Sequence, residues 1–315
     1  MVGSVFLQVG LGEMIEETLY YTRERLWDIS DKVAWLNDGQ SMYEDPEVVA
    51  RYDVSNLECM ISTFRSSSDL EFIDMCKHFK FRSVLDLGCG AGAFFHLLKA
   101  EFGDIEYVGY DASVAQITRA KELAGEAVFE VRDISEISVE EFSRFDAIHS
   151  YSVFSFMSVE KQLSTLRRIV ESGSRFILMT GTTRAELRYW PQHIFRSFSA
   201  RLHGKPVLTA VAFPFDRELE AAVSSTDSHT VTFEDKPFEN SRLLNASGRD
   251  GGALDTRRFK TDKLWRRLPF GRTVRLRWAH IAPREWISAR RQDYSLMTEK
   301  EVYAHVSAIL RARKT

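Results

Sequence analysis

The chain has 315 residues, a formal net charge of −3 and a hydrophobic content of 44 %. This length fits one large domain or one domain with an added module, and the composition is that of an ordinary globular protein. The near-balanced charge gives no overall reason to expect nucleic acid as a partner. No apolar run approaches the ~18 residues that a membrane span needs.

The first 80 residues predict a helical, acidic segment. Ile15, Leu19 and Leu26 recur at near-helical spacing, and the residues from Asp45 to Glu47 are typical of a helix start because an acid precedes a proline there. The polar run from Ser66 to Asp69 predicts an N-cap cluster before a further helix over residues 70–78.

The N-terminus and the cysteines indicate the cell compartment in which the protein is expected. The apolar start, residues 2–11, has no basic lead or cleavage-like site, which argues against a secretory signal. The cysteines Cys59, Cys76 and Cys89 are odd in number and widely spaced, so they form neither a zinc pattern nor a disulfide framework. We therefore expect a cytoplasmic protein without a metal site.

The most informative motif covers residues 84–92, Val-Leu-Asp-Leu-Gly-Cys-Gly-Ala-Gly. An apolar strand that contains one acid, Asp86, runs into three alternating glycines, and a helix-like segment follows at once. Glycine lets the backbone approach a ligand closely. A pyrophosphate site would favour N–H donors with little negative charge nearby, whereas the carboxylate of Asp86 suits a cationic or polyhydroxylated ligand.

Strands and helices alternate after this motif. Strands are predicted at residues 106–111, 127–133, 145–151 and 175–179, and helices at about 92–102, 113–123 and 158–171. This alternation predicts a parallel sheet with right-handed crossovers. Ligands of such sheets bind at the carboxyl ends of the strands, where the glycine loop, Asp111, Asp133 and residues 150–154 all fall.

Together these segments resemble the class I S-adenosylmethionine (SAM)-dependent methyltransferases over residues 80–183. The resemblance implies an α/β, Rossmann-like fold with a mostly parallel seven-stranded sheet and SAM as cofactor. It implies that the glycine loop wraps the amino-acid end of SAM, that Asp111 holds the ribose and that Asp133 and its neighbour contact the adenine. The expected cofactor-binding residues are Asp86, Gly88, Cys89, Gly90, Gly92, Asp111, Ala112, Asp133, Ile134 and Ser150.

Three segments follow from this reading: an N-terminal helical lid or substrate segment (1–80), a SAM-binding core (81–183) and a C-terminal part (184–315). The last is longer than the family pattern requires. Residues 230–233 and 273–278 alternate in polarity and predict a closing antiparallel strand pair. Residues 184–222 predict a helical insertion, residues 240–255 a loop, and Thr298 to Glu301 a capping box that starts a final helix.

Catalytic and substrate-binding residues are less clearly marked. His149 and Tyr151, on the strand that faces the transferred methyl group, are the expected catalytic pair, because a neutral imidazole accepts a hydroxyl proton. A structural histidine remains the alternative for His149, and His193 and His203 are weaker base candidates. Four further residues are expected to bind the acceptor: Tyr43, Tyr52, Arg275 and Arg277. The tyrosines could equally be core aromatics, and the arginines, in a basic stretch, could equally form a solvated face.

The sequence thus predicts a methyltransferase that acts on an oxygen or nitrogen of a small or medium-sized metabolite, including anionic, sugar-linked and lipid-linked ones. The strand-end sequence from His149 to Phe154 lacks the Asn/Asp-Pro-Pro-aromatic signature of many enzymes that methylate base amino groups. Two alternatives stay open. One is a non-catalytic protein that binds SAM, and the other is a nicotinamide-dependent oxidoreductase, which the GxGxG spacing opposes. The oligomeric state is not predicted.

Overall fold

The computed structural model describes residues 57, 60, 61, 64, 67–151, 153, 154, 157, 159–181, 214–224, 226–237 and 275–312. Their strands form one seven-stranded sheet in the order β3-β2-β1-β4-β5-β7-β6. The strands are β1 (Ser83–Leu87), β2 (Glu106–Asp111), β3 (Val128–Val131), β4 (Ala147–Tyr151), β5 (Arg175–Gly181), β6 (His229–Pro237) and β7 (Arg275–Pro283).

The first five strands are parallel, and β7 pairs antiparallel with both β5 and β6. The order reverses at β1, which lies between β2 and β4. Such a switch point opens a crevice at the carboxyl ends of the strands. The predicted fold class is confirmed, including the closing antiparallel pair. The division of the chain into three segments stays a prediction.

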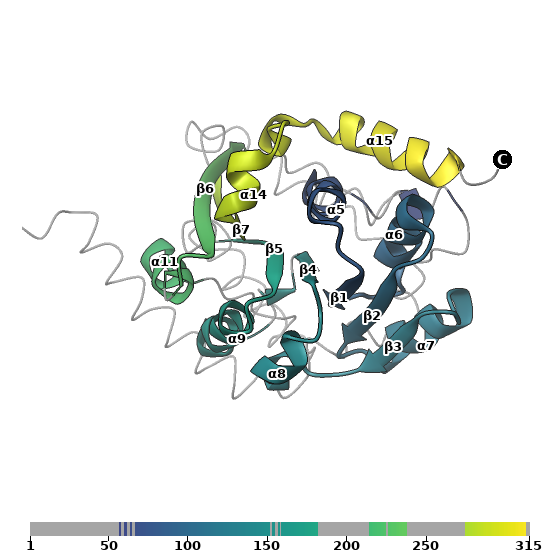
Figure 1. Cartoon of the computed structure of the whole chain (residues 1–315), viewed down its shortest axis with the longest axis horizontal. Coiled ribbons are helices and arrows are strands. Elements are labelled where there is room, and N and C mark those ends of the chain that lie inside the picture. Colours follow the sequence, from purple (N-terminus) through teal and green to yellow (C-terminus); the bar gives the residue numbers. More distant parts are fainter. Residues whose placement is uncertain are drawn as a thin grey trace, which may run out of the picture.

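Helices cover both faces of the sheet, as Figure 1 shows, with α5, α6 and α15 on one side and α8, α9 and α11 on the other. The first face carries α5 (Ser67–Phe79), α6 (Ala93–Phe102), α7 (Val114–Leu123), α14 (Arg284–Ala289) and α15 (Glu299–Ala312). The second carries α8 (Val139–Phe142), α9 (Val159–Glu171) and α11 (Asp216–Val223). Two 3₁₀ helices, η2 (Ile134–Glu136) and η4 (Tyr294–Leu296), complete the described elements.

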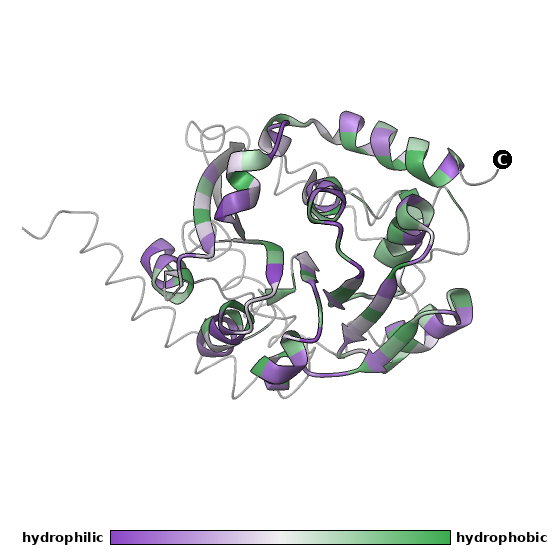
Figure 2. Ribbon diagram, viewed as in Figure 1, coloured by the Kyte–Doolittle hydropathy of each residue, from purple (hydrophilic) through white to green (hydrophobic). Residues whose placement is uncertain are grey.

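Side-chain alternation in the strands produces two separate apolar cores. In β1, Val84 joins the core under α5 and α6, whereas Leu85 and Leu87 join the core under α9. Both faces of the central strands are buried, which explains why β1 is buried along its whole length. Figure 2 shows hydrophobic and hydrophilic residues on opposite sides of helices such as α9, as expected for helices that cover a sheet.

Helix α5 departs from its sequence prediction in one respect. Residues 67–69 were expected to cap the helix from outside, but they form its first turn, and the side chains of Ser68 and Asp69 are buried. The first turn of α5 therefore lies inside the protein, next to the carboxyl ends of the strands. Within the described ranges, no helix has the length and apolar character required to cross a membrane.

Candidate active site

The glycine loop between β1 and α6 adopts a backbone path that side chains oppose. Gly88, Gly90 and Gly92 have φ values of 74°, 53° and 84°, in the left-handed region that glycine enters without steric cost. The amides of Gly88 and Cys89 both donate to the carbonyl oxygen of Tyr110, at 2.7 and 3.1 Å. These bonds tie the loop to the end of β2.

The three glycines differ in what surrounds them. A Cβ atom on Gly88 would lie 2.0 Å from a methyl group of Val153, and one on Gly92 would lie 3.0 Å from the ring of Phe129. Among the described residues, a Cβ atom on Gly90 would meet only the Oε1 atom of Gln116, at 3.8 Å. Gly88 and Gly92 thus serve internal packing, whereas Gly90 leaves open space beside its backbone.

An unsatisfied acceptor lies beside that open space. The side chain of Gln116 is buried, and its Oε1 atom has no hydrogen-bond partner among the residues that the structure describes. Because a buried polar atom without a partner costs about 1–3 kcal/mol, its presence next to an open backbone indicates a site for a ligand that donates hydrogen bonds.

Asp111 ends β2 with its carboxylate against the glycine loop. Its Oδ2 atom accepts from the amide of Gly90 at 3.0 Å, and its Oδ1 atom accepts from the amide of Ser113 at 2.9 Å. Ser113 in turn caps α7 by accepting from the amide of Gln116. The loop, Asp111 and Gln116 therefore form one hydrogen-bonded unit at the strand ends.

Asp133 lies beyond the end of β3, the strand next to β2. Its carboxylate accepts from the amide of Ser135 at 2.8 Å, which caps η2, and lies 3.4 Å from the Nζ atom of Lys161. Burial alone would raise the pKa of Asp133, but the hydrogen bonds from Ser135 and the charge of Lys161 lower it overall. An acidic side chain therefore stands at the end of β2 and another just beyond the end of β3.

Asp86 is buried beneath the glycine loop. Its Oδ2 atom accepts from the phenol of Tyr107 at 2.6 Å, and its Oδ1 atom lies 2.8 Å from the Nδ1 atom of His149. Both carboxylate oxygens thus bind side chains of the neighbouring strands β2 and β4, which favours a structural role for Asp86 over direct contact with a ligand.

His149 is enclosed on all sides. Its Nε2 atom lies 3.1 Å from a carboxylate oxygen of Asp69 on α5, and its ring stacks on Phe94 with 3.7 Å between the centroids. Burial alone would lower its pKa, but the charges and hydrogen bonds of Asp86 and Asp69 raise it to about 9. A histidine that is already protonated near neutral pH cannot remove a proton from the substrate that receives the methyl group. Asp86 and Asp69 therefore favour a structural role for His149.

These features fit SAM. Bare backbone at Gly90, an unpaired acceptor at Gln116 and two strand-end carboxylates match the hydrogen-bond donors of an amino acid and a nucleoside. Residues 78–213 match the sequence profile of a family described as "Methyltransferase domain".

Residues 78–213 therefore carry a methyltransferase domain. SAM is its cofactor, and the protein is an enzyme. No curated protein shows significant sequence similarity to the chain.

Solved structures similar to this methyltransferase include other methyltransferases. The magnesium protoporphyrin IX methyltransferase of Synechocystis is 11 % identical, with a TM-score of 0.43 and an alignment over 74 % of this chain and 91 % of that one. The plantazolicin methyltransferase is 17 % identical, with a TM-score of 0.46 and coverage of 86 % and 100 %. The identification rests on the family match and on the site itself.

At the end of β4, the methyltransferase places two expected site residues on opposite faces. Ser150 is buried, and within the described ranges its hydroxyl oxygen has no hydrogen-bond partner. Tyr151 is half-buried and, by strand alternation, lies on the same face as His149 and α5. Ser150 therefore resembles Gln116 in offering a buried hydrogen-bonding group at the ligand-binding edge.

The structure describes the surroundings of three further expected site residues, Cys89, Ile134 and Ala112. Other expected residues lie outside the described ranges. Cys89 is buried, and burial together with the charges of Asp86 and Asp111 raises the pKa of its thiol well above the ordinary value. Ile134 is buried, and Ala112 lies between Asp111 and the cap of α7. Tyr43, Tyr52, His193, His203 and the side chains of Arg275 and Arg277 lie outside the described part of the chain.

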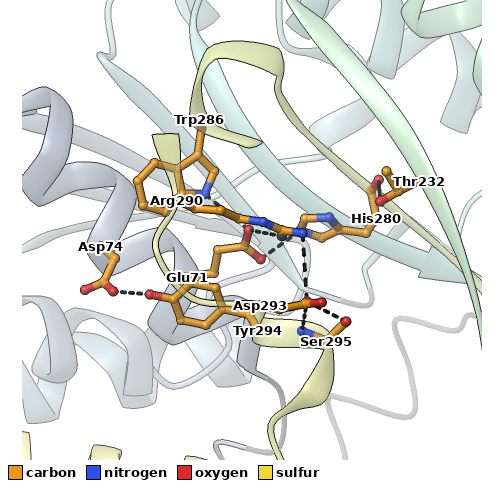
Figure 3. A network of polar contacts seen from close by, with 9 residues as sticks. All are labelled: Glu71, Asp74, Thr232, His280, Trp286, Arg290, Asp293, Tyr294 and Ser295. Atoms are coloured by element: carbon orange, nitrogen blue, oxygen red, sulfur yellow. Dashed lines mark hydrogen bonds and ion pairs between the residues drawn. The ribbon is translucent and has the colours of Figure 1, made fainter. Parts of the chain in front are cut away.

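A second buried polar network joins α5 to the C-terminal elements, as shown in Figure 3. The carboxylate of Glu71 lies 2.9 Å from the Nε2 atom of His280 on β7, 3.0 Å from a guanidinium nitrogen of Arg290 and 3.2 Å from the indole nitrogen of Trp286. Tyr294 donates to Asp74 beside it. Sequence reasoning missed Asp69 and Glu71, although two acids in an otherwise apolar helical run are a detectable signal.

Proposed function

We propose that this methyltransferase transfers the methyl group of SAM to an oxygen or nitrogen atom of a small or medium-sized metabolite. The observation that carries the proposal is the segment after β4, which faces the reacting end of the cofactor in this fold. Val153 packs on Gly88 and Phe154 is buried in the core. Val153 thus closes over the glycine loop, and the sequence from His149 to Phe154 has no proline-aromatic signature on which a nucleobase would stack.

The cofactor supplies a methyl group on a positively charged sulfur when it is bound. The chain supplies position: Gly90 admits the ligand, Asp111 receives hydroxyl donors, and Gln116 and Ser150 offer buried hydrogen-bonding groups. Such positioning accounts for much of the acceleration of an in-line displacement. We assign the ribose to Asp111 and the adenine side to Asp133 and Ile134.

The acceptor is assigned to the face that bears α5. Tyr151 is the end residue of β4 on this face, and we propose that it orients the acceptor by a hydrogen bond. His149 is bound to two carboxylates, so we propose that it supports the site and does not remove the acceptor's proton. Tyr43 and Tyr52 are proposed as acceptor contacts because they belong to the acid-rich N-terminal segment, which directly precedes α5 in the sequence.

Arg275 and Arg277 are proposed to bind an anionic group of the acceptor, such as a phosphate or a carboxylate. Both belong to β7 and share one face of it by alternation. Sugar-linked and lipid-linked metabolites remain within the proposed class. We further propose that the enzyme works in the cytoplasm and not on nucleic acid, because the cysteines give no disulfide framework and the net charge is −3.

The decisive experiment is methyl transfer from SAM carrying a tritiated methyl group into a cell extract, followed by separation into metabolites, protein and nucleic acid. We expect label in the metabolite fraction, and mass spectrometry of the labelled compound then distinguishes O-methyl from N-methyl products. The Asp111→Ala variant is the matched control and should lose the signal. Label in protein or nucleic acid would contradict the proposed acceptor class, and SAM binding without any transfer would indicate the non-catalytic alternative.

The role of Tyr151 is tested separately with the Tyr151→Phe variant. Removal of one hydroxyl group should lower kcat/KM for the acceptor by about tenfold, the value of roughly one hydrogen bond, and should leave the dissociation constant of SAM unchanged. An unchanged kcat/KM would remove Tyr151 from the acceptor site.

A further inference from the structure

Asp69, His149 and Asp86 form a buried cluster that spans three elements. The imidazole of His149 on β4 donates to Asp86 on β1 from one nitrogen and to Asp69 on α5 from the other. The side chains of all three are at most 7 % exposed. Two carboxylates flank one imidazole, so even a protonated imidazole leaves a surplus of one acid, and hence of negative charge, in the protein interior.

No neighbouring group within the described ranges cancels that charge. The groups next to the cluster are the phenol of Tyr107, which donates to Asp86, the thiol of Cys89, and the rings of Phe72 and Phe94. Burial and the charge of Asp86 raise the pKa values of both Tyr107 and Cys89, so both are neutral. A buried net charge is costly unless an opposite charge lies close by.

The Glu71 network, shown in Figure 3, fixes the position of α5 relative to the cluster. Glu71 lies two residues after Asp69 and binds His280, Arg290 and Trp286 on the β7 and α14 side. Asp69 is therefore held at one place by contacts that do not involve the cofactor site. Its charge has a fixed position relative to β1 and the glycine loop.

We propose that the Asp69–His149–Asp86 cluster presents its net negative charge to the methionine end of SAM and so makes the site favour positively charged SAM over its product, S-adenosylhomocysteine (SAH). Asp86 is two residues before Gly88, at the start of the loop that receives this end of the cofactor. Transfer breaks the sulfur–methyl bond, and the sulfur keeps the bonding electron pair and becomes neutral. The same cluster therefore weakens its hold on the ligand once the methyl group has left.

This inference rests on SAM binding and is independent of the acceptor. Its test is the dissociation constants of SAM and of SAH, each measured by calorimetry on the full chain. The Asp69→Asn variant should lower the SAM-to-SAH affinity ratio on the order of tenfold, because it removes a negative charge that attracts the positive sulfur of SAM but not the neutral sulfur of SAH. The matched control is Glu71→Gln, which also removes a buried acid from α5 but on the side away from the loop. It should leave the ratio within about twofold.

Equal losses of SAM and SAH affinity in Asp69→Asn would show a purely structural role and overturn the proposal, as would an equal change of the ratio in Glu71→Gln. If the Asp69→Asn variant does not fold, the pKa of His149 in the SAM and SAH complexes of the natural protein tests the same proposal. Because coupling between sites is reciprocal, the positive sulfur of SAM should lower the pKa of His149 relative to the SAH complex. Histidine-selective ¹⁵N NMR between pH 7 and 10.5 reads this difference, and identical titration in the two complexes would refute the charge coupling.

Discussion

The protonated state of His149 predicts how the stability of the protein depends on pH. The perturbation is a rise in pH across the range in which this residue loses its proton. The free energy of unfolding is compared between the natural chain and a His149→Gln variant. Its two carboxylate partners raise the pKa of His149 to about 9 in the folded chain, from an ordinary value of 6.5. The unfolded chain has lost both partners, so it takes the ordinary value.

The magnitude follows from this difference. A pKa that is higher in the folded state stabilises the fold fully below pH 6.5, and the contribution disappears as the pH rises through about 9. Each pH unit is worth about 1.4 kcal/mol, so the whole effect is about 3 kcal/mol. Between these two pH values, the free energy of unfolding should fall by about 1.4 kcal/mol per pH unit because of this residue alone.

Urea denaturation at pH values from 6 to 10 measures the effect. The difference between the unfolding free energies of the natural chain and His149→Gln should shrink by about 3 kcal/mol across this range. A His305→Gln variant is the matched control, because it removes an exposed imidazole of α15 by the same substitution. A pH-independent difference for His149→Gln would refute a protonated imidazole between Asp69 and Asp86.

Three further predictions concern the glycine loop and its neighbours. Asp111→Ala should weaken SAM binding by about 1.5–3 kcal/mol in calorimetry, the value of hydrogen bonds to a charged acceptor, and unchanged affinity would place the ribose elsewhere. Gly90→Ala should abolish most SAM binding but cost only about 1–2 kcal/mol of stability, for its left-handed backbone. Gly109→Ala should cost more stability, because its Cβ would lie 2.9 Å from Cys89 and Phe129; thermal unfolding of both variants shows whether the order is reversed. Cys89 should resist iodoacetamide in the folded protein at pH 8 because burial raises its pKa, and rapid alkylation detected by mass spectrometry would contradict its burial.

The elements of the core could be predicted from sequence because they depend on local patterns. Short apolar runs that alternate with amphipathic segments specify parallel strands and covering helices, and the glycines of residues 88–92 specify the turn between them. The acids Asp111 and Asp133 are predicted as site residues because they stand at strand ends and because the family resemblance implies a role for them in cofactor binding. The structure confirms the strands and the antiparallel closing pair, β6 and β7.

The environment of His149 could not be predicted in this way. Strand alternation placed His149 and Tyr151 on one face but did not tell which element would cover that face. Asp69 is 80 residues away in the chain, and its helix brings it against the imidazole. Local pattern favoured an N-cap for this acid, and only the packing of α5 on β4 and β1 turned it into a buried partner.

The sequence by itself determined the fold class, the order of the strands' motifs and the kind of ligand that the loop admits, because glycine positions, hydrophobic periods and strand-end acids act over a few neighbouring residues. Only the tertiary structure decided which charges meet in the interior. The protonation of His149, the anchoring of α5 through Glu71 and the open space at Gly90 all depend on contacts between distant segments, and burial sets the strength of each of them.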